Sequence, residues 1–351
     1  MKSHVLTAFG APLQAIEAPT PQPQGSEVLL KTLAAGVCHS DLHLADGYYD
    51  MGGGKRFTLA DRGIAVPITM GHEIAGEIVA VGPDAKGVKP GERYVAYPWI
   101  GCGECAVCRD GQEQLCNDAR TLGIRRPGGY STHVMVPHPR YLYPLGKLTP
   151  QQAAPYACSG LTTYSALRRV GEAVYRNRPI LILGAGGLGL MCLKLLKALG
   201  GKGAIVADID PKKREAALAA GALAAIDPKA ENAGRVIRDA AKGLPAAVID
   251  FVGSNETARL GTDILPRGGK YVIVGLFGGD LTLALPLLPI RSITIEGMLV
   301  GTLAEFREVM DLVSQGKVEP MRLDERKLDR ANEALQDLRA GRIVGRAVLT
   351  P

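Results

Sequence analysis

The chain has 351 residues, more than one compact core usually holds, which indicates two domains. Hydrophobic residues make up 46% of it and charged residues 22%, and no apolar run is long enough to cross a membrane. The formal charge of +6 is scattered without a basic run, which argues against nucleic-acid binding. Seven cysteines without a signal-peptide pattern predict metal sites in a reducing compartment, so we expect a cytoplasmic protein.

The first part of the chain, to about residue 157, has a pattern of short strands. Proline and glycine punctuate the chain between the predicted strands, which cover residues 4–9, 27–35, 74–81 and 93–96. This pattern predicts an all-β, barrel-like domain. Residues 48–67 hold three consecutive glycines and several charges, and we interpret them as a long surface loop.

Three separate segments, two within this part and one at its end, contribute Cys38, His72 and Cys158. Together they would hold zinc with two thiolates, one imidazole and one open position, which is the arrangement of catalytic zinc. The open position lets the metal bind an alcohol oxygen and lower its pKa. Spacing alone does not join residues so far apart, and Cys158 by itself is more typical of a small buried hydrophobic residue. His39 and His43 by themselves are typical of surface or capping positions.

Four more cysteines fall within fifteen residues, spaced C-x₂-C-x₂-C-x₇-C: Cys102, Cys105, Cys108 and Cys116. Four thiolates can close a tetrahedral shell around zinc, and a closed shell is structural because it leaves no open position. Glycines at 101, 103 and 111 allow the sharp turns that this requires. Disulfides and an iron–sulfur site are the alternatives. We favour zinc because the chain also carries candidates for a second zinc site and a nucleotide-binding fold.

A glycine-rich segment, Gly184-Ala185-Gly186-Gly187-Leu188-Gly189, follows the apolar run 180–183, which has the pattern of a buried parallel strand. A helix with apolar residues three positions apart and a second strand over 204–208 come next. The motif alone is weak, but the strand–loop–helix–strand context is that of dinucleotide binding. Gly184 would make the tight turn, Gly186 would let the backbone approach the pyrophosphate, and Gly189 would let helix and strand pack closely.

Asp208 lies at the end of the second strand, 19 residues after Gly189. A carboxylate there accepts hydrogen bonds from both ribose hydroxyls and repels a 2′-phosphate, which predicts NAD over NADP. Predicted strands over 247–252 and 270–275, and helices over 212–220 and 255–265, continue a doubly wound parallel sheet. The tail has predicted helices over 303–315 and 329–339 and a strand over 343–349, and we expect it to return to the first domain.

With its motifs in this order, the chain resembles the zinc-dependent alcohol dehydrogenases of the medium-chain dehydrogenase/reductase superfamily over essentially its whole length. It is most similar to the tetrameric bacterial and archaeal branch, which has a similarly long loop before its Gly-His-Glu. The resemblance implies a GroES-like β-barrel catalytic domain over 1–157, completed by 301–351, and a Rossmann NAD-binding domain over 158–300. It also implies two zinc ions per chain, one catalytic and one structural, NAD, a small alcohol or ketone substrate, and a homotetramer.

Residue roles follow from the same resemblance. Cys38, His72 and Cys158 match the catalytic zinc ligands, and the four clustered cysteines match the structural ones. Glu73 matches a carboxylate that can approach the metal, and Asp41 one that orients the site from behind the ligands. Ser40 would hold the alcohol hydroxyl and pass its proton through the cofactor ribose to His43. The implied cofactor-binding residues are His39, Thr162, Gly184, Gly186, Gly187, Leu188, Gly189, Asp208, Lys213, Val274, Leu276 and Arg346. The implied substrate-pocket residues are Tyr49, Trp99 and Leu299.

Alternatives within the superfamily are a polyol or formaldehyde-type dehydrogenase and a zinc-free quinone reductase relative. The three candidate ligands argue against the zinc-free relative. A non-catalytic NAD-binding relative that kept only the structural zinc is the alternative from another class, and Ser40 and His43 argue against it. If Trp99 and Leu299 line the pocket, it should be apolar, which favours a medium-sized primary or secondary alcohol, aromatic or alicyclic, over a polyol. His39 stands where some relatives carry arginine, so we expect a weaker grip on the pyrophosphate and faster cofactor release.

Overall fold

The computed structural model describes residues 1–351, which form two compact units. The first unit holds residues 1–48, 58–161 and 301–351, and the second holds 49–57 and 162–300. Residues 49–57, which were expected in the first domain, lie in the second unit. The reason is a close backbone contact, since a Cβ on Gly52 would lie 2.8 Å from the carbonyl carbon of Gly279.

The predicted surface loop over 48–67 is also partly wrong, because it contains a two-stranded sheet of β4 (Tyr48–Asp50) and β5 (Arg56–Thr58) and the 3₁₀ turn η1 (Ala60–Arg62). The strands were not predicted because the segment is rich in glycine and charged residues and lacks an apolar strand pattern.

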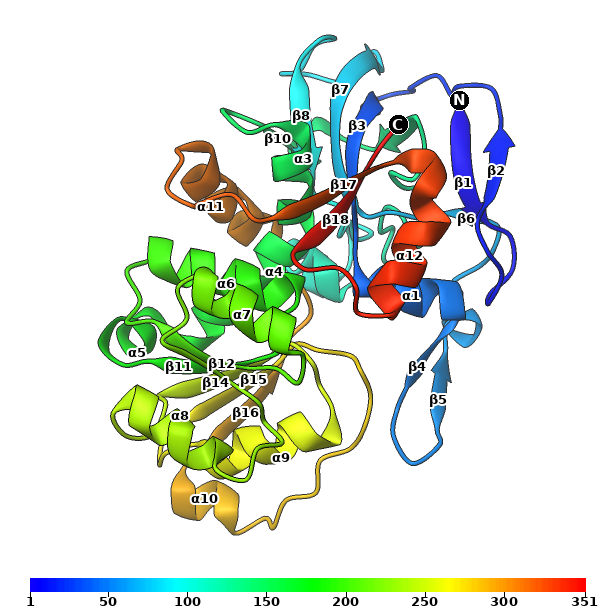
Figure 1. Ribbon diagram of the computed structural model, residues 1–351. Coiled ribbons are helices and arrows are strands. Elements are labelled where there is room, and N and C mark those ends of the chain that lie inside the picture. The colour runs from blue at the N-terminus through cyan, green and yellow to red at the C-terminus, as the bar shows by residue number, and fades with distance from the viewer. The chain divides into compact units, whose positions relative to one another are not determined.

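The first unit is built on a seven-stranded sheet (Figure 1). Its strand order is β10 (Leu142–Pro144), β8 (Arg93–Ala96), β7 (Glu73–Val81), β3 (Val28–Val37), β18 (Arg346–Thr350), β17 (Leu323–Lys327), with β9 (His133–Val136) also paired to β3. All pairs are antiparallel except β17 with β18. A three-stranded sheet has the order β2 (Gln14–Glu17), β1 (Lys2–Leu6), β6 (Ile68–Thr69). The predicted β-rich domain is thus confirmed in class.

The central strand β3 leads to the candidate ligands. Its register places Gly36 opposite Glu73 of β7 and Val37 opposite Ala347 of β18. The end of β3, the start of β7 and the start of β18 therefore lie side by side at the same end of these three central strands. The residues next to these ends, Cys38 and His72, are brought together by the register and not by spacing in the sequence.

The helices of this unit range from four residues to the twelve of α11 (Leu303–Ser314). α1 (His39–Asp46) follows β3 directly, and Arg339 of α12 (Ala331–Arg339) is paired with its Asp46 at 2.7 Å. The other helices are α2 (Ala106–Arg109), α3 (Pro150–Ala153) and α11 (Leu303–Ser314), and the 3₁₀ turns are η2 (Glu113–Leu115), η3 (Pro139–Tyr141), η4 (Ala154–Ala157) and η5 (Leu328–Arg330).

The second unit is a six-stranded parallel sheet in the order β13 (Ala224–Ile226), β12 (Ala204–Ala207), β11 (Ile180–Leu183), β14 (Ala247–Asp250), β15 (Lys270–Ile273), β16 (Thr294–Gly297). The strand order reverses between β11 and β14, so the doubly wound sheet predicted from the sequence is confirmed. The strands β11, β12 and β14 are buried throughout because helices cover both faces of the sheet.

Two layers of helices flank this sheet. Ile237 of α8 (Ala233–Ala241) and Ile264 of α9 (Asn255–Ile264) share one core with Leu181, Val248 and Tyr271. Figure 1 shows α6 (Gly187–Ala198) and α7 (Pro211–Ala219) on the opposite face. The remaining helices are α5 (Glu172–Asn177), α10 (Leu287–Arg291) and α4 (Ser159–Val170), which contains the boundary between the units.

Candidate functional site

Cys38, His72 and Cys158 converge in the first unit. Cys38 is the residue before α1, His72 immediately precedes β7, and Cys158 lies between η4 and α4. The side chains are buried, and their ligand atoms all lie within 4.8 Å of one another. The predicted trio is thus a real cluster in the structure.

The geometry of this cluster fits zinc. The two sulfurs are 3.9 Å apart, close to the separation of about 3.8 Å that two thiolates have on one tetrahedral zinc. A disulfide would bring them to about 2.05 Å. His72 Nε2 is buried and has no hydrogen-bond partner in the protein, which suits a nitrogen that binds a metal. Two thiolates and one imidazole form a donor set that zinc prefers.

Asp41 lies behind the imidazole. Its Oδ1 is 3.3 Å from His72 Nδ1, and its Oδ2 accepts a hydrogen bond of 2.8 Å from the Cys38 backbone N–H. The carboxylate is fully buried. A carboxylate facing Nδ1 favours the tautomer that leaves Nε2 free for a metal, which is the usual arrangement around zinc-binding histidines.

Ser40 and His43 are carried by α1, one turn apart. Ser40 Oγ lies 3.7 Å from Cys38 Sγ, beside the three candidate ligands. Burial lowers the pKa of the half-buried His43, and Cys38 and Asp46 partly oppose this effect. A neutral imidazole at this position can accept a proton near neutral pH.

Glu73 is held by a buried ion pair. Its Oε2 accepts a 2.9 Å hydrogen bond from Arg346 Nε, and its Oε1 accepts from Arg346 Nη2 and, at 3.1 Å, from the Ser159 N–H. Gly36 leaves the room for this carboxylate, since a Cβ there would lie 1.8 Å from Glu73 Oε2. The guanidinium of Arg346 is therefore engaged inside the first unit, and its contact with a pyrophosphate stays a prediction.

Trp99 packs on the metal cluster. Its ring centroid is 5.3 Å from that of His72, and its Nε1 donates a 3.0 Å hydrogen bond to the Ala157 carbonyl, next to Cys158. The side chain is buried. It thus gives the imidazole an apolar wall.

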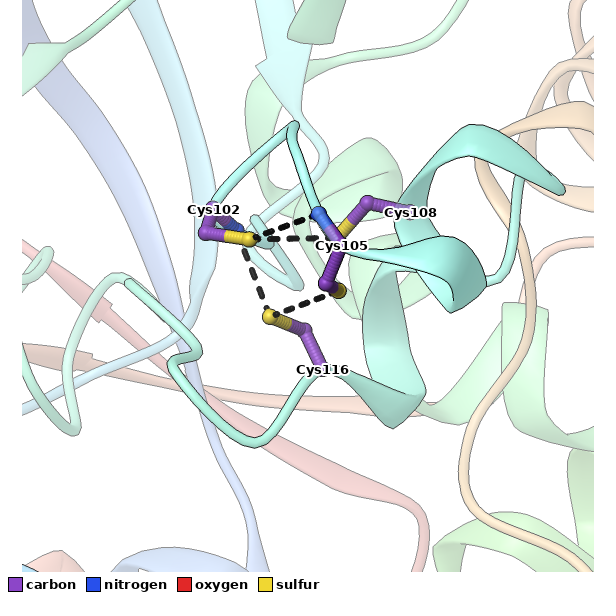
Figure 2. A group of neighbouring side chains, drawn as sticks. All are labelled: Cys102, Cys105, Cys108 and Cys116. Carbon is purple, nitrogen blue, oxygen red and sulfur yellow. Dashed lines mark hydrogen bonds between the residues drawn. The ribbon is translucent and has the colours of Figure 1, made fainter.

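The second cysteine group forms the other candidate metal site, and Figure 2 shows its four sulfurs turned toward a common centre. Cys102 Sγ is 3.9 Å from Cys108 Sγ, and Cys105 Sγ is 3.8 Å from Cys116 Sγ. These are again tetrahedral thiolate separations. All seven cysteines are free, so disulfides are ruled out as an explanation for this loop.

Backbone groups prepare this loop for metal binding. The N–H groups of Glu104 and Cys105 point at Cys102 Sγ at 3.4 Å each, and they lower the pKa of Cys102 to about 6. Burial raises the pKa of Cys108 to about 12, so its thiolate requires the metal's charge. A Cβ on Gly101 would lie 2.4 Å from Cys108 Sγ, which explains the glycine.

Glu113 supports the same loop and was not identified from the sequence. Its Oε2 accepts hydrogen bonds from the Gly101 N–H at 3.1 Å and from the Tyr141 hydroxyl at 2.7 Å. Its Oε1 lies 3.1 Å from Arg140 Nη2. The sequence around Glu113 has no motif that would identify this role. Two of its partners, Arg140 and Tyr141, are 27 and 28 residues away in the sequence.

The glycine loop of the second unit has the geometry that its sequence predicts. Gly184 has a φ of +96°, which favours glycine at this turn. A Cβ on Gly189 would lie 2.0 Å from the Gly184 carbonyl oxygen, so helix and strand could not approach as they do. A Cβ on Gly186 would meet nothing within 4 Å, which leaves this backbone open to a ligand. α6 begins with Gly187 and Leu188.

Asp208 lies directly after β12 and beside the glycine loop. Its Oδ2 accepts a 2.7 Å hydrogen bond from the Ala185 N–H, and its Oδ1 accepts one of 2.9 Å from the Asp210 N–H. Thr162 is buried, and its hydroxyl has no hydrogen-bond partner in the protein, so it has a free polar atom for a ligand. A nucleotide fits these residues.

The other predicted residues fall in both units. Lys213 lies on α7, Val274 and Leu276 follow β15, and Tyr49 and Leu299 also belong to the second unit. His39, Trp99 and Arg346 belong to the first unit. The roles that the resemblance implies for these residues stay predictions.

The sequence is similar to known proteins over its whole length. Residues 24–147 match the family described as "Alcohol dehydrogenase GroES-like domain", and residues 187–315 match "Zinc-binding dehydrogenase". The "NAD-dependent alcohol dehydrogenase" of Sulfurisphaera tokodaii is 41% identical over 100% of both chains, and that of Saccharolobus solfataricus is 40% identical over 100% of both. The "D-arabinose 1-dehydrogenase (NADP(+))" of Saccharolobus solfataricus is 34% identical and covers 100% of this chain and 97% of its own.

Among solved structures, the alcohol dehydrogenase of Aeropyrum pernix superimposes with a TM-score of 0.89 at 29% identity, over 100% of both chains. The agreement therefore extends to both units and to the whole length of the relatives. The chain belongs to the zinc-dependent alcohol dehydrogenases of the medium-chain dehydrogenase/reductase superfamily.

Proposed function

We propose that this chain is a zinc- and NAD-dependent alcohol dehydrogenase that reversibly oxidises primary or secondary alcohols to aldehydes or ketones. The convergence of Cys38, His72 and Cys158 carries the proposal, because two buried thiolates and one free imidazole nitrogen suit zinc with one position left for substrate. Zinc bound there would act as a Lewis acid toward the alcohol oxygen. The four-cysteine group would hold a second, structural zinc.

The chain's own residues would handle the proton. Ser40 Oγ, beside Cys38, would accept a hydrogen bond from the alcohol hydroxyl and take up its proton while its own hydroxyl proton is released toward His43. His43 lies one turn further along α1, and its lowered pKa keeps the imidazole neutral and able to receive the proton. Asp41 would hold the orientation of His72, and the buried Trp99 would exclude water from one side of the imidazole.

NAD would be the hydride acceptor. The open backbone at Gly186 and the dipole of α6 would bind the pyrophosphate, and the remaining glycine-loop residues would shape its path. Asp208 favours NAD over NADP because its carboxylate would repel a 2′-phosphate. Thr162, Val274 and Leu276 would border the nicotinamide, Lys213 the adenosine ribose, and His39 and Arg346 the pyrophosphate. His39→Arg should slow NADH dissociation, and an unchanged off-rate in stopped-flow would oppose a role for this residue.

For the substrate, Trp99, Tyr49 and Leu299 favour a medium-sized aromatic or alicyclic alcohol. A sugar or other polyol is the second candidate, because one relative of 34% identity is named as a D-arabinose dehydrogenase. That relative is named as using NADP⁺, whereas Asp208 favours NAD here. Initial rates with benzyl alcohol, cyclohexanol and D-arabinose, each with both cofactors, separate the two candidates.

The first test is the zinc content of protein purified without added metal. Two zinc ions per chain, one of them absent from Cys38→Ala, would support both sites. One zinc that resists mild chelation would leave only the four-cysteine group occupied. The catalytic proposal would then lose its main support, whatever the substrate.

We also propose a cytoplasmic homotetramer. None of the helices combines the length and the apolar character that spanning a bilayer requires. Phe277, Leu285 and Ile290 are 73%, 76% and 63% exposed, and β16 is an edge strand of the second unit's sheet. Exposed apolar groups and an unpaired strand edge in the same unit suit a surface that another copy covers. A light-scattering mass of four chains would agree with this assembly, and a mass of one chain would refute it.

A further inference from the structure

Tyr130 is a fully buried tyrosine whose hydroxyl reaches the residue behind the candidate zinc ligand His72. The hydroxyl donates a 3.1 Å hydrogen bond to Asp41 Oδ2. The same oxygen accepts the Cys38 N–H, and the other carboxylate oxygen, Oδ1, faces His72 Nδ1 at 3.3 Å. Tyr130, Asp41 and His72 therefore form one chain of polar contacts that ends at the metal cluster.

The backbone holds Tyr130 in place. Its N–H donates to the Met70 carbonyl at 2.9 Å, and its own carbonyl accepts from the His4 N–H at 2.7 Å. Its ring fills the space beside Gly71, where a Cβ would lie 2.4 Å from the ring. The ring thus supports the backbone that leads to His72, while the hydroxyl contacts the side chain that faces His72. These two contributions can be separated by experiment.

We propose that Tyr130 is a positioning residue for the zinc site and that it acts through Asp41 on His72. With both of its donors on Oδ2, the carboxylate turns Oδ1 toward the imidazole. A buried carboxylate that loses one donor is free to rotate and to share its remaining donor differently. His72 Nδ1 would then lose its fixed partner, and the imidazole would hold zinc less firmly.

This inference rests on the proposed zinc site, and the experiment separates the two. Zinc release to the chelator 4-(2-pyridylazo)resorcinol should give two phases in the parent protein. The phase missing from Cys38→Ala belongs to the Cys38–His72–Cys158 site, and the other belongs to the four-cysteine group. If the parent protein lacks the phase that belongs to the Cys38–His72–Cys158 site, the proposed function fails. If the phase is present, the variants below test Tyr130 itself.

Tyr130→Phe keeps the ring and removes only the hydroxyl. Outer-shell partners of zinc ligands typically contribute 10- to 100-fold to metal affinity, so we expect roughly 3- to 10-fold faster release for Tyr130→Phe, one hydrogen bond further out, and about 10- to 100-fold for Asp41→Asn. The four-cysteine phase should not change. Cobalt(II) bound at the Cys38–His72–Cys158 site should show a shifted d–d absorption band in Tyr130→Phe.

Tyr271→Phe is the matched control. The Tyr271 hydroxyl also donates to a buried carboxylate, Asp250, at 2.6 Å, but in the second unit. This variant should leave both zinc phases unchanged. In the double variant Tyr130→Phe, Asp41→Asn, zinc release from the Cys38–His72–Cys158 site should be no faster than in Asp41→Asn alone. Unchanged release from Tyr130→Phe would overturn the proposal, as would an undiminished effect of Tyr130→Phe in the Asp41→Asn background.

Discussion

Replacing Glu73 by methionine should destabilise the first unit strongly. The substitution keeps the side-chain volume but removes the acceptor of three hydrogen bonds, two from Arg346 and one from the Ser159 N–H. Arg346 is 3% exposed and would remain as an unpaired buried cation. Breaking a buried ion pair in this way costs about 3–5 kcal/mol. For a domain of 150–250 residues that corresponds to a lowering of Tm by roughly 6–20 °C.

The assay is urea unfolding at equal zinc, followed by fluorescence. The chain has one tryptophan, Trp99, and it lies in the first unit, so the signal reports on that unit. Glu73→Met with Arg346→Met should recover most of the lost stability, because apolar residues of similar volume can replace a buried pair. Gly36→Ala should also destabilise, since its Cβ would displace the carboxylate. A free energy of unfolding within about 1 kcal/mol of the parent for Glu73→Met would refute this reasoning.

Three further changes test other parts of the structure. Gly101→Ala should remove the structural zinc alone, because its Cβ would lie 2.4 Å from Cys108 Sγ; elemental analysis should fall from two zinc ions to one. Gly189→Ala should weaken NADH binding and cost about 1–3 kcal/mol through overpacking, and an unchanged fluorescence titration would contradict this. His4 is buried, and burial lowers its pKa in the folded state. As the pH falls below about 6.5 the unfolded state therefore binds the proton first, and stability is lost. His4→Leu should reduce the drop in urea midpoint between pH 7.5 and pH 5.5, and an identical drop would argue against it.

Local patterns explain what the sequence predicted well. The glycine loop, the buried strands β11 and β12 and the four-cysteine loop each lie within a short segment, so spacing and periodicity suffice to identify them. The trio Cys38, His72 and Cys158 was grouped through its chemistry and a family resemblance. Its convergence depends on the pairing of β3 with β7, which no local pattern encodes.

Long-range contacts account for what was missed. α1 was not predicted because its start depends on a reciprocal backbone and side-chain contact between Cys38 and Asp41, in a segment of mixed polarity. Glu113 and Tyr130 have ordinary local surroundings, and their partners are 28 and 89 residues away. The edge strands β13 and β16 are short and only partly buried, so they lack the apolar run that marked the central strands.

The hairpin over residues 49–57 also determines where the chain can be divided into fragments or joined to a relative in a chimera. It belongs to the second unit, although the chain on both sides of it belongs to the first. A fragment comprising only residues 162–300 would therefore lack part of its own surface and would expose the backbone around Gly279. Chimeras that exchange the nucleotide-binding domain between relatives should fold more often when residues 49–57 are exchanged together with that domain. A chimera with a single junction near residue 161 would instead combine a hairpin from one parent with a loop from the other.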